Sequence, residues 1–161
     1  FLYYGDEIGM RYQSGLVSKE GGFSRTGSRT PMQWNNGKNL GFSDADECYL
    51  PVDTNADAPT VENQKDDPDS IYKVVKDVIA LRHSNKDLGN DGDFKVVYAE
   101  KDKYPFIYQR GEFIVVVNPS SDDVTVPFDF EVKETIYQIG KTQVEDKVVT
   151  AFASSFAIFK V

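Results

Sequence analysis

Residues 92–161 contain seven short β-rich runs, and their spacing constrains the fold more than any other feature of the chain. Turn residues separate the runs, as at Arg110-Gly111 and Asn118-Pro119-Ser120. The runs cover 94–99, 106–109, 113–117, 124–128, 135–139, 144–150 and 156–161. Short strands at this spacing predict an antiparallel β-sandwich or barrel that could fold alone.

One segment before these runs, residues 67–86, has a helical period. Apolar side chains recur there on one face: Ile71, Val74, Val75, Val78, Ile79 and Leu81. Asp67 is suited to cap the N-terminus, Pro68 to occupy the first helical position, and Gly89 to end the helix. We therefore predict a helix over 67–86, with a single apolar stripe.

Residues 1–66 have a different composition from the rest of the chain. A short β-like run at 1–4 is followed by a long stretch rich in Gly, Ser, Asn and Asp. Loops of this length in a compact protein are usually functional. The chain opens with Phe1 inside an apolar run and without an initiating Met, so we expect it to be cut from something longer.

Composition excludes several classes of partner. A hydrophobic fraction of 40% allows a buried core, and the net charge of -8 argues against nucleic acid or an anionic membrane. No apolar stretch approaches the roughly 20 residues of a membrane-spanning helix. Cys48 is the only cysteine, so an internal disulfide is excluded and a packing role is expected. We expect a cytoplasmic location.

Two motifs carry a resemblance to a known family. They are Y-G-D-E-I-G-M at 4–10 and R-T-P-M-Q-W at 29–34, followed in order by G-F-S at 41–43, Y-L-P-V at 49–52 and the helix with Leu81-Arg82. As a set they resemble the glycoside hydrolase family that contains the α-amylases. The nearest branch is that of oligo-1,6-glucosidases, dextran glucosidases, α-glucosidases and trehalose synthases.

The resemblance implies a fold of mixed α and β class. It places residues 1–4 in the eighth strand of a (β/α)8 barrel, 5–66 in the loop after that strand, and 67–86 in the eighth helix. We thus predict a barrel remnant at 1–88 and, at 89–161, a C-terminal antiparallel β-sandwich of Greek-key type.

No catalytic residue is assigned in this chain. The family's nucleophilic Asp, its acid/base Glu and its third Asp lie in motifs that do not occur here. Retaining glycosidases need two carboxyls about 5–5.5 Å apart, whereas adjacent acids on a strand point to opposite faces. One histidine, His83 at a helix end, provides no metal-ligand cluster. No cofactor and no metal are expected.

Arg25 is the candidate substrate-binding residue. The resemblance implies that an arginine four residues before Arg29 lines the terminal glucose subsite, and a guanidinium offers donors in a fixed fork. The alternative is a solvated loop arginine. Many relatives have Asp after this arginine, whereas this chain has Thr26. We expect Asp6, Glu7, Arg29 and Trp34 to hold the loop; Trp34 could instead stack on a sugar.

The leading hypothesis is a longer parent that hydrolyses or transfers α-glucosyl units, with an α-glucoside or oligosaccharide as substrate and a chain that is inactive alone. Alternatives for the β-domain are a carbohydrate-binding module or a purely structural role. Exposed aromatics on one sheet face would favour the former; candidates are Tyr98, Tyr104, Tyr108 and Tyr137. We also expect that the chain self-associates through its N-terminal segment.

Overall fold

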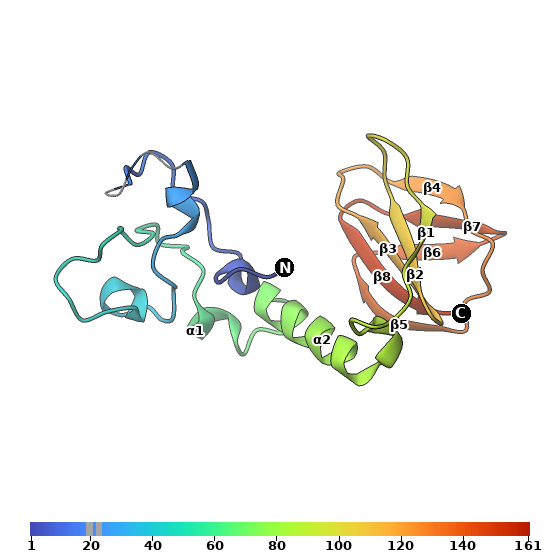
Figure 1. Cartoon of the computed structure of the whole chain (residues 1–161), viewed down its shortest axis with the longest axis horizontal. Coiled ribbons are helices and arrows are strands. Elements are labelled where there is room, and N and C mark those ends of the chain that lie inside the picture. Colours follow the sequence, from blue (N-terminus) through green and yellow to red (C-terminus); the bar gives the residue numbers. More distant parts are fainter. Residues whose placement is uncertain (19–20, 22–23) are drawn as a thin grey trace. The chain divides into compact units, whose positions relative to one another are not determined.

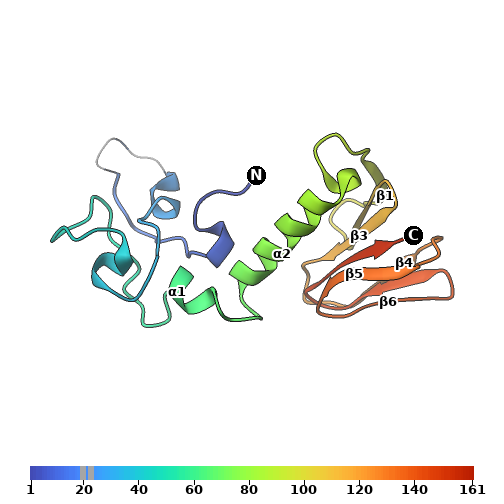
Figure 2. The same cartoon turned by 90° about the horizontal axis from the view of Figure 1, so that it is seen from below.

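The computed structural model describes residues 1–18, 21 and 24–161. The chain divides into two compact units, Phe1–Ala80 and Leu81–Val161. The first unit is mostly loop with short helical turns, and the second is built of strands (Figures 1 and 2). The division falls inside the longest helix, α2 (Ile71–Ser84). The domain boundary at 88/89 stays a prediction.

The second unit is an antiparallel sandwich of two sheets, as predicted. The five-stranded sheet has the order β1-β2-β3-β8-β5 and the three-stranded sheet the order β4-β7-β6. The chain changes sheet after β3, β4, β5 and β7, so three successive crossings between the layers separate the first three strands from the β6–β7 hairpin. The strands are β1 (Lys95–Tyr98), β2 (Phe106–Arg110), β3 (Phe113–Asn118), β4 (Val124–Pro127), β5 (Glu134–Ile139), β6 (Thr142–Glu145), β7 (Val148–Ala151) and β8 (Ser155–Lys160).

Alternation along the strands fills the space between the sheets. In β8, Ala157 and Phe159 point into the core between the layers, while Ile158 packs on the other face of the same sheet. The core contains side chains from both sheets: Ile107, Ile114, Val116, Val126, Phe128, Val149, Ala151, Ala157 and Phe159. A second apolar cluster on the outer face of the five-stranded sheet includes Leu81 and Leu88.

Residues 144–150 form a hairpin rather than a single strand. Asp146 and Lys147 both have positive φ, of 47° and 63°, which is the geometry of a type I′ turn. The turn separates β6 from β7, so the structure has eight strands where the sequence predicted seven runs. The turn was not predicted because it contains neither Gly nor Asn, which are the residues that usually mark such a turn.

Helix α2 begins later than predicted. Ser70 caps it: its Oγ accepts the Lys73 N–H at 3.1 Å and its carbonyl accepts the Val74 N–H at 3.1 Å. Asp67 instead accepts the Asp69 N–H in a preceding turn. The helix ends at Ser84, and Gly89 follows a separate 3₁₀ helix, η4 (Lys86–Leu88). The competing Asx turn at Asp67 explains the delayed start.

Before α2, the described residues of the first unit form three 3₁₀ helices and one short α-helix: η1 (Asp6–Ile8), η2 (Ser24–Ser28), η3 (Lys38–Gly41) and α1 (Val61–Gln64). Residues 1–4 are not a strand, which corrects that prediction. A strand requires a hydrogen-bonded neighbour, and the described residues of this unit include no strand that could pair with it.

Candidate functional site

The R-T-P-M-Q-W motif, called the R-T-P-M-Q-W spine below, is a buried segment of the first unit. Thr30 and Gln33 are each 1% exposed, and Pro31 and Met32 are buried as well. The Gln33 side chain donates to the Pro59 carbonyl, and the Gln33 carbonyl accepts the Val61 N–H at 3.1 Å. A buried amide that pairs on both sides fixes the two segments it joins. The motif therefore holds the loop together.

The Y-G-D-E-I-G-M motif folds into a tight turn around η1. Asp6 accepts the Tyr3 N–H and Glu7 accepts the Gly5 N–H, each at 2.8 Å. Gly5 has φ 93°, and a Cβ there would lie 2.6 Å from the Met10 sulfur. Only glycine suits such a position. Both carboxylates thus bind backbone amides of their own turn.

Arg25 lies in η2 and is exposed. Its carbonyl accepts the Ser28 hydroxyl at 2.9 Å, and the Thr26 carbonyl accepts the Arg29 N–H at 3.0 Å. These bonds fix the backbone between the two arginines in a compact turn. Arg29 is also exposed at the end of this turn.

Trp34 is attached to the loop by its backbone. Its N–H donates to the Leu40 carbonyl at 2.8 Å, and its carbonyl accepts the Glu62 N–H at 2.9 Å. Its side chain is 50% exposed. The indole ring therefore presents surface to solvent while the main chain at Trp34 joins η3 to α1.

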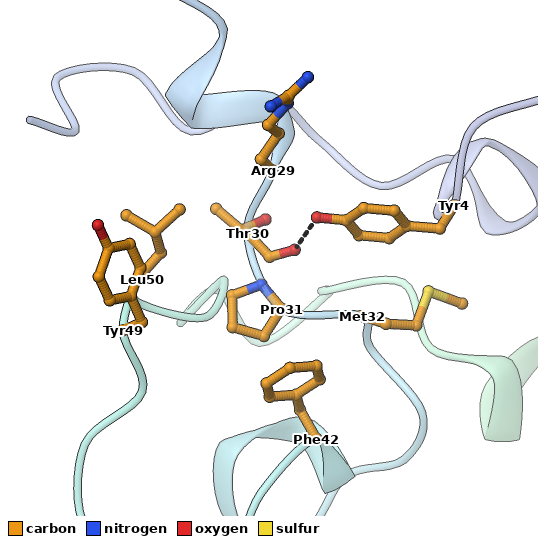
Figure 3. A pocket seen from close by; sticks show the side chains of 8 residues that line it. All are labelled: Tyr4, Arg29, Thr30, Pro31, Met32, Phe42, Tyr49 and Leu50. Atoms are coloured by element: carbon orange, nitrogen blue, oxygen red, sulfur yellow. Dashed lines mark hydrogen bonds between the residues drawn. The ribbon is translucent and has the colours of Figure 1, made fainter. Parts of the chain in front are cut away.

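A cavity of about 440 Å³ lies beside the R-T-P-M-Q-W spine (Figure 3). Tyr4 donates its hydroxyl to the Thr30 carbonyl at 3.0 Å, across one end of the cavity. Figure 3 shows Phe42 and Tyr49 on different sides of Pro31, with Arg29 extending away from them. The lining residues are Tyr4, Arg29, Thr30, Pro31, Met32, Phe42, Tyr49 and Leu50.

The surroundings of Tyr4 disfavour ionisation of its hydroxyl. Burial raises the pKa of Tyr4, and the neighbouring Tyr3 raises it further, while the positive charge of Arg29 acts in the opposite direction. The hydroxyl donates a hydrogen bond to the Thr30 carbonyl. Tyr4 therefore lines the cavity with its hydroxyl bonded to the main chain of Thr30.

A buried carboxylate stabilises the far side of the loop. Asp53 is 2% exposed, and Arg11 donates to it through Nε at 2.9 Å and to the exposed Asp57 through Nη1 at 3.0 Å. Burial acts to raise the pKa of Asp53, but hydrogen bonds from Asn55 and Arg11 outweigh it and lower the pKa. The hydrogen bonds of Arg11 to Asp57 and then to Asp53 raise the pKa of Arg11.

The structure brings together only some of the predicted site residues. Arg29 lines the cavity, whereas the described residues Arg25, Glu7 and Trp34 do not line it. Among the residues described, no group of three or more His, Cys, Asp or Glu is placed to hold a metal ion. In the same part of the chain, no helix has the length and apolarity that crossing a bilayer requires.

Sequence reasoning missed two features of this unit. Phe42, Tyr49 and Leu50 belong to motifs of the resemblance, but nothing in the sequence assigned them to a cavity wall. The Arg11–Asp53 pair joins residues 42 positions apart. No local pattern predicts a pair of that separation. The sequence did contain one signal for the cavity: the motifs G-F-S at 41–43 and Y-L-P-V at 49–52 each include an aromatic residue.

Comparisons with known proteins agree with this local structure. The family profile "Alpha amylase, catalytic domain" matches residues 1–91. A probable oligo-1,6-glucosidase 2 of Bacillus subtilis is 42% identical over 87 residues, covering 54% of this chain and 15% of the relative. The human amino acid transporter heavy chain SLC3A1 is 34% identical over 123 residues, covering 72% and 18%.

Solved structures show the same fold. The isomaltulose synthase of Erwinia rhapontici NX5 matches 99% of this chain with a TM-score of 0.82 at 19% identity, and 35% of that enzyme is covered. The chain spans a smaller share, less than a fifth, of the length of the B. subtilis and human relatives. The profile match over more than half of the chain, in the segment that contains both motifs, shows that this protein belongs to the α-amylase family.

Proposed function

We propose that the longer protein to which this chain belongs is a retaining glycoside hydrolase of the α-glucosidase type, acting on α-glucosides or oligosaccharides. The observation that carries the proposal is the α-amylase catalytic-domain match over residues 1–91. The relative from B. subtilis, named a probable oligo-1,6-glucosidase, supports the choice of branch. The two reacting carboxyls are assigned to parts of the longer protein other than this chain.

Within this proposal, the first unit supplies a loop at the rim of the active site. Arg25 recognises hydroxyls of the terminal sugar, while Asp6, Glu7, Arg29 and Trp34 keep the loop in shape. The engagement of Asp6 and Glu7 with backbone amides supports a structural use for both acids. The exposed position of Arg25 supports a role at the surface of the loop.

The test is hydrolysis by the longer protein of isomalto-oligosaccharides, maltose and trehalose, measured as released glucose. Arg25→Ala should reduce kcat/KM by about a hundredfold, and Arg25→Lys should recover only part of it because the fork is lost. Lys38→Ala, a charge-matched change on an exposed residue of the same loop, should leave kcat/KM unchanged. Silence on all α-glucosides would overturn the proposal. The chain by itself should release no glucose.

A second candidate is a non-catalytic subunit, favoured by the 34% identity to a protein named as a transporter heavy chain. The two candidates differ in one measurement. A non-catalytic subunit would leave every α-glucoside intact under conditions in which the longer protein is folded. Turnover of any of them selects the hydrolase.

For the second unit we propose a structural role in preference to sugar binding. Three of the four candidate tyrosines, Tyr98, Tyr108 and Tyr137, pack against the apolar clusters of the sandwich. Tyr104 is 46% exposed, but a single exposed ring does not make the pair of aromatic side chains on one sheet face that a sugar-binding surface would need. Calorimetric titration with maltoheptaose should give no heat of binding, and a saturable signal would favour the carbohydrate-binding alternative.

We also propose that the chain self-associates through its N-terminal segment and that the protein is cytoplasmic. Phe1 and Leu2 are fully or largely exposed apolar side chains, which supports association. Size-exclusion chromatography should show a concentration-dependent oligomer, and a strict monomer would contradict it. The free Cys48 is in keeping with a reducing compartment, and fractionation of cells would test the location.

A further inference from the structure

Asn36 and Gly37 form the only Asn-Gly pair in the chain. The pair lies between Trp34 and η3, in the first unit. The side-chain amide of an asparagine can react with the main-chain nitrogen of the next residue. Glycine allows this reaction most readily, because it has no Cβ to hinder the approach and adopts many backbone conformations. The sequence therefore places its most reactive asparagine close to Trp34.

The reaction consumes only water and releases ammonia. The Gly37 nitrogen gives its proton to a solvent base and bonds to the Asn36 Cγ, while the Cγ–Nδ2 bond breaks and Nδ2 leaves as ammonia with a proton from water. The product of this step is a cyclic imide, a succinimide. Water then opens the ring at Cγ to give aspartate, or at the main-chain carbonyl carbon to give isoaspartate. Either product has a carboxylate where the neutral amide was.

In the folded chain the attacking nitrogen is engaged in a hydrogen bond. The Gly37 N–H donates to the Asn35 Oδ1 at 2.8 Å. Asn35 is half-buried and its amide lies against Gly41, where a Cβ would come within 2.5 Å of the Asn35 Nδ2. Gly41 has φ 71°, so this close approach depends on glycine. The acceptor is thus held in place, and the proton that must leave for the reaction stays bonded.

The amide that would be attacked is held by α1. The Asn36 Nδ2 donates to the Asn63 Oδ1 at 2.8 Å and to the Glu62 Oε2 at 3.3 Å. The same Glu62 oxygen accepts the Asn36 N–H at 3.1 Å. These three bonds restrain the side chain and the backbone of Asn36 together, against the change of conformation that ring closure requires.

We propose that Asn36 is a deamidation site that the fold of the first unit suppresses, so that conversion follows the unfolding of this unit. Ring closure waits for openings in which the bonds of Gly37 and Asn36 are broken together. The converted residue cannot restore the contact. A carboxylate at position 36 has no N–H for the Asn63 oxygen and faces the Glu62 carboxylate, so the connection between this loop and α1 is lost.

The test is peptide mass spectrometry of the 161-residue chain after incubation at mildly alkaline pH. Conversion at Asn36 is measured from the gain in mass when an amide becomes a carboxyl group. It should be at least about tenfold faster in urea that unfolds the first unit than in buffer, a ratio equivalent to the loss of one or more hydrogen bonds. A smaller ratio would overturn the proposal.

A pair of variants at position 35 tests the bond to the attacking nitrogen. Asn35→Ala removes the acceptor of the Gly37 N–H and should speed conversion in buffer about fivefold, the equivalent of one hydrogen bond. In urea it should react at the rate of the unaltered chain. Asn35→Asp keeps an oxygen acceptor and should stay slow in buffer. Lys38→Ala, on the other side of Gly37, is the exposed control and should change neither rate.

A second variant keeps the test decisive if Asn35→Ala does not fold, which circular dichroism and Trp34 fluorescence establish. Asn63→Ala removes the acceptor of the Asn36 Nδ2 and should also speed conversion in buffer, with an unchanged rate in urea. An unchanged rate in buffer for every folded variant that lacks one of these acceptors would overturn the proposal.

Asn36→Asp reproduces the aspartate product directly. It should lower the urea midpoint of the Trp34 transition further than Asn36→Ala does, because it adds a charge that faces Glu62 to the loss of the same donors. Combining Asn36→Asp with Glu62→Gln should remove the extra loss. Equal midpoints for Asn36→Asp and Asn36→Ala would contradict the proposed effect of conversion on the contact with α1.

Discussion

The two units of the chain bury different kinds of side chain. In the second unit, the space between the sheets is filled by aliphatic and aromatic groups, and Asn118 is its one fully buried amide. In the first unit, the most buried residues include Thr30, Gln33, Asp53 and Thr60, each at or below 2% exposure. One unit is organised by apolar packing and the other by hydrogen bonds.

This difference follows from what each segment has to do. Strands repeat every two residues, so an alternating sequence can fill a core with apolar groups. A loop without regular structure leaves its amides and carbonyls unpaired, and buried polar side chains must satisfy them. The half-buried Gln64 does the same, since it donates to the Ile8 carbonyl at 2.8 Å and accepts the Tyr72 N–H at 3.1 Å. Stability of the first unit should therefore depend on single polar atoms.

The largest effect is expected in the sandwich core. Phe128 is 1% exposed, and its ring packs against those of Phe130 and Phe159. Phe128→Ala should lower the free energy of unfolding by about 3–5 kcal/mol, since it leaves a cavity between the sheets. Urea titration followed by far-ultraviolet circular dichroism measures this, and Phe94→Ala, at an exposed site, should cost far less. Equal losses in the two variants would contradict an apolar core.

The next effect concerns the buried carboxylate of the first unit. Asp53→Ala removes the partner of Arg11 and of both Asn55 donors, and should cost about 2–3 kcal/mol at pH 7. Trp34 is the only tryptophan and lies in this unit, so its fluorescence in urea reports the loss. Lys38→Ala, which breaks an exposed ion pair with Asp46, is the control and should cost below about 0.5 kcal/mol.

Asp53 should also make the free energy of unfolding depend on pH, in a direction that its lowered pKa determines. The pKa of Asp53 is lower in the folded chain than its ordinary value of about 3.9. Its contribution is therefore complete above that value and is lost as the pH falls through the folded pKa. The difference between the unaltered chain and Asp53→Asn should be constant above about pH 5 and shrink below it. A difference that grew on acidification would contradict the assignment.

A smaller effect is expected at the start of α1. Thr60 is fully buried, and its hydroxyl accepts the Asn63 N–H at 3.1 Å as the helix cap. Thr60→Ala should cost about 1 kcal/mol, because one helix donor is left without a partner. Thr60→Ser keeps the hydroxyl and should recover most of that loss. The Trp34 signal in urea again distinguishes the two, and an equal cost for both variants would point to packing instead of capping.

The sequence predicted the second unit better than the first, for a physical reason. The run at 156–161 was predicted and forms β8, where Ala157 and Phe159 lie in the core between the sheets and Phe156 and Ile158 lie on the outer face. The split at Asp146-Lys147 was not visible, since a left-handed turn formed by these residues is set by the strands around it. Local propensity is overridden where tertiary pairing decides.

In the first unit the sequence predicted motifs but not their geometry. The resemblance marked Arg29 and Trp34, and the structure places one at a cavity and the other at the junction of η3 and α1. The Arg11–Asp53 pair and the Phe42–Tyr49 walls join residues that only the folded loop brings together. The prediction of a strand at residues 1–4 was wrong. These residues have side chains typical of a strand, but a strand also needs a neighbouring strand to which its backbone can hydrogen-bond.

The smallest effect expected is a gain, at the turn between β6 and β7. Lys147 has φ 63°, a left-handed conformation that costs an L-residue with a side chain more than it costs glycine. Lys147→Gly should therefore stabilise the sandwich by about 0.5 kcal/mol, since the lost ion pair with Asp129 lies between two exposed side chains and contributes little. Lys95→Gly in β1 has no such strain to relieve and should destabilise. A gain confined to the circular dichroism transition, with Trp34 fluorescence unmoved, would mean that the two units unfold separately; a shift of both signals would mean that the loop depends on the sandwich for its stability.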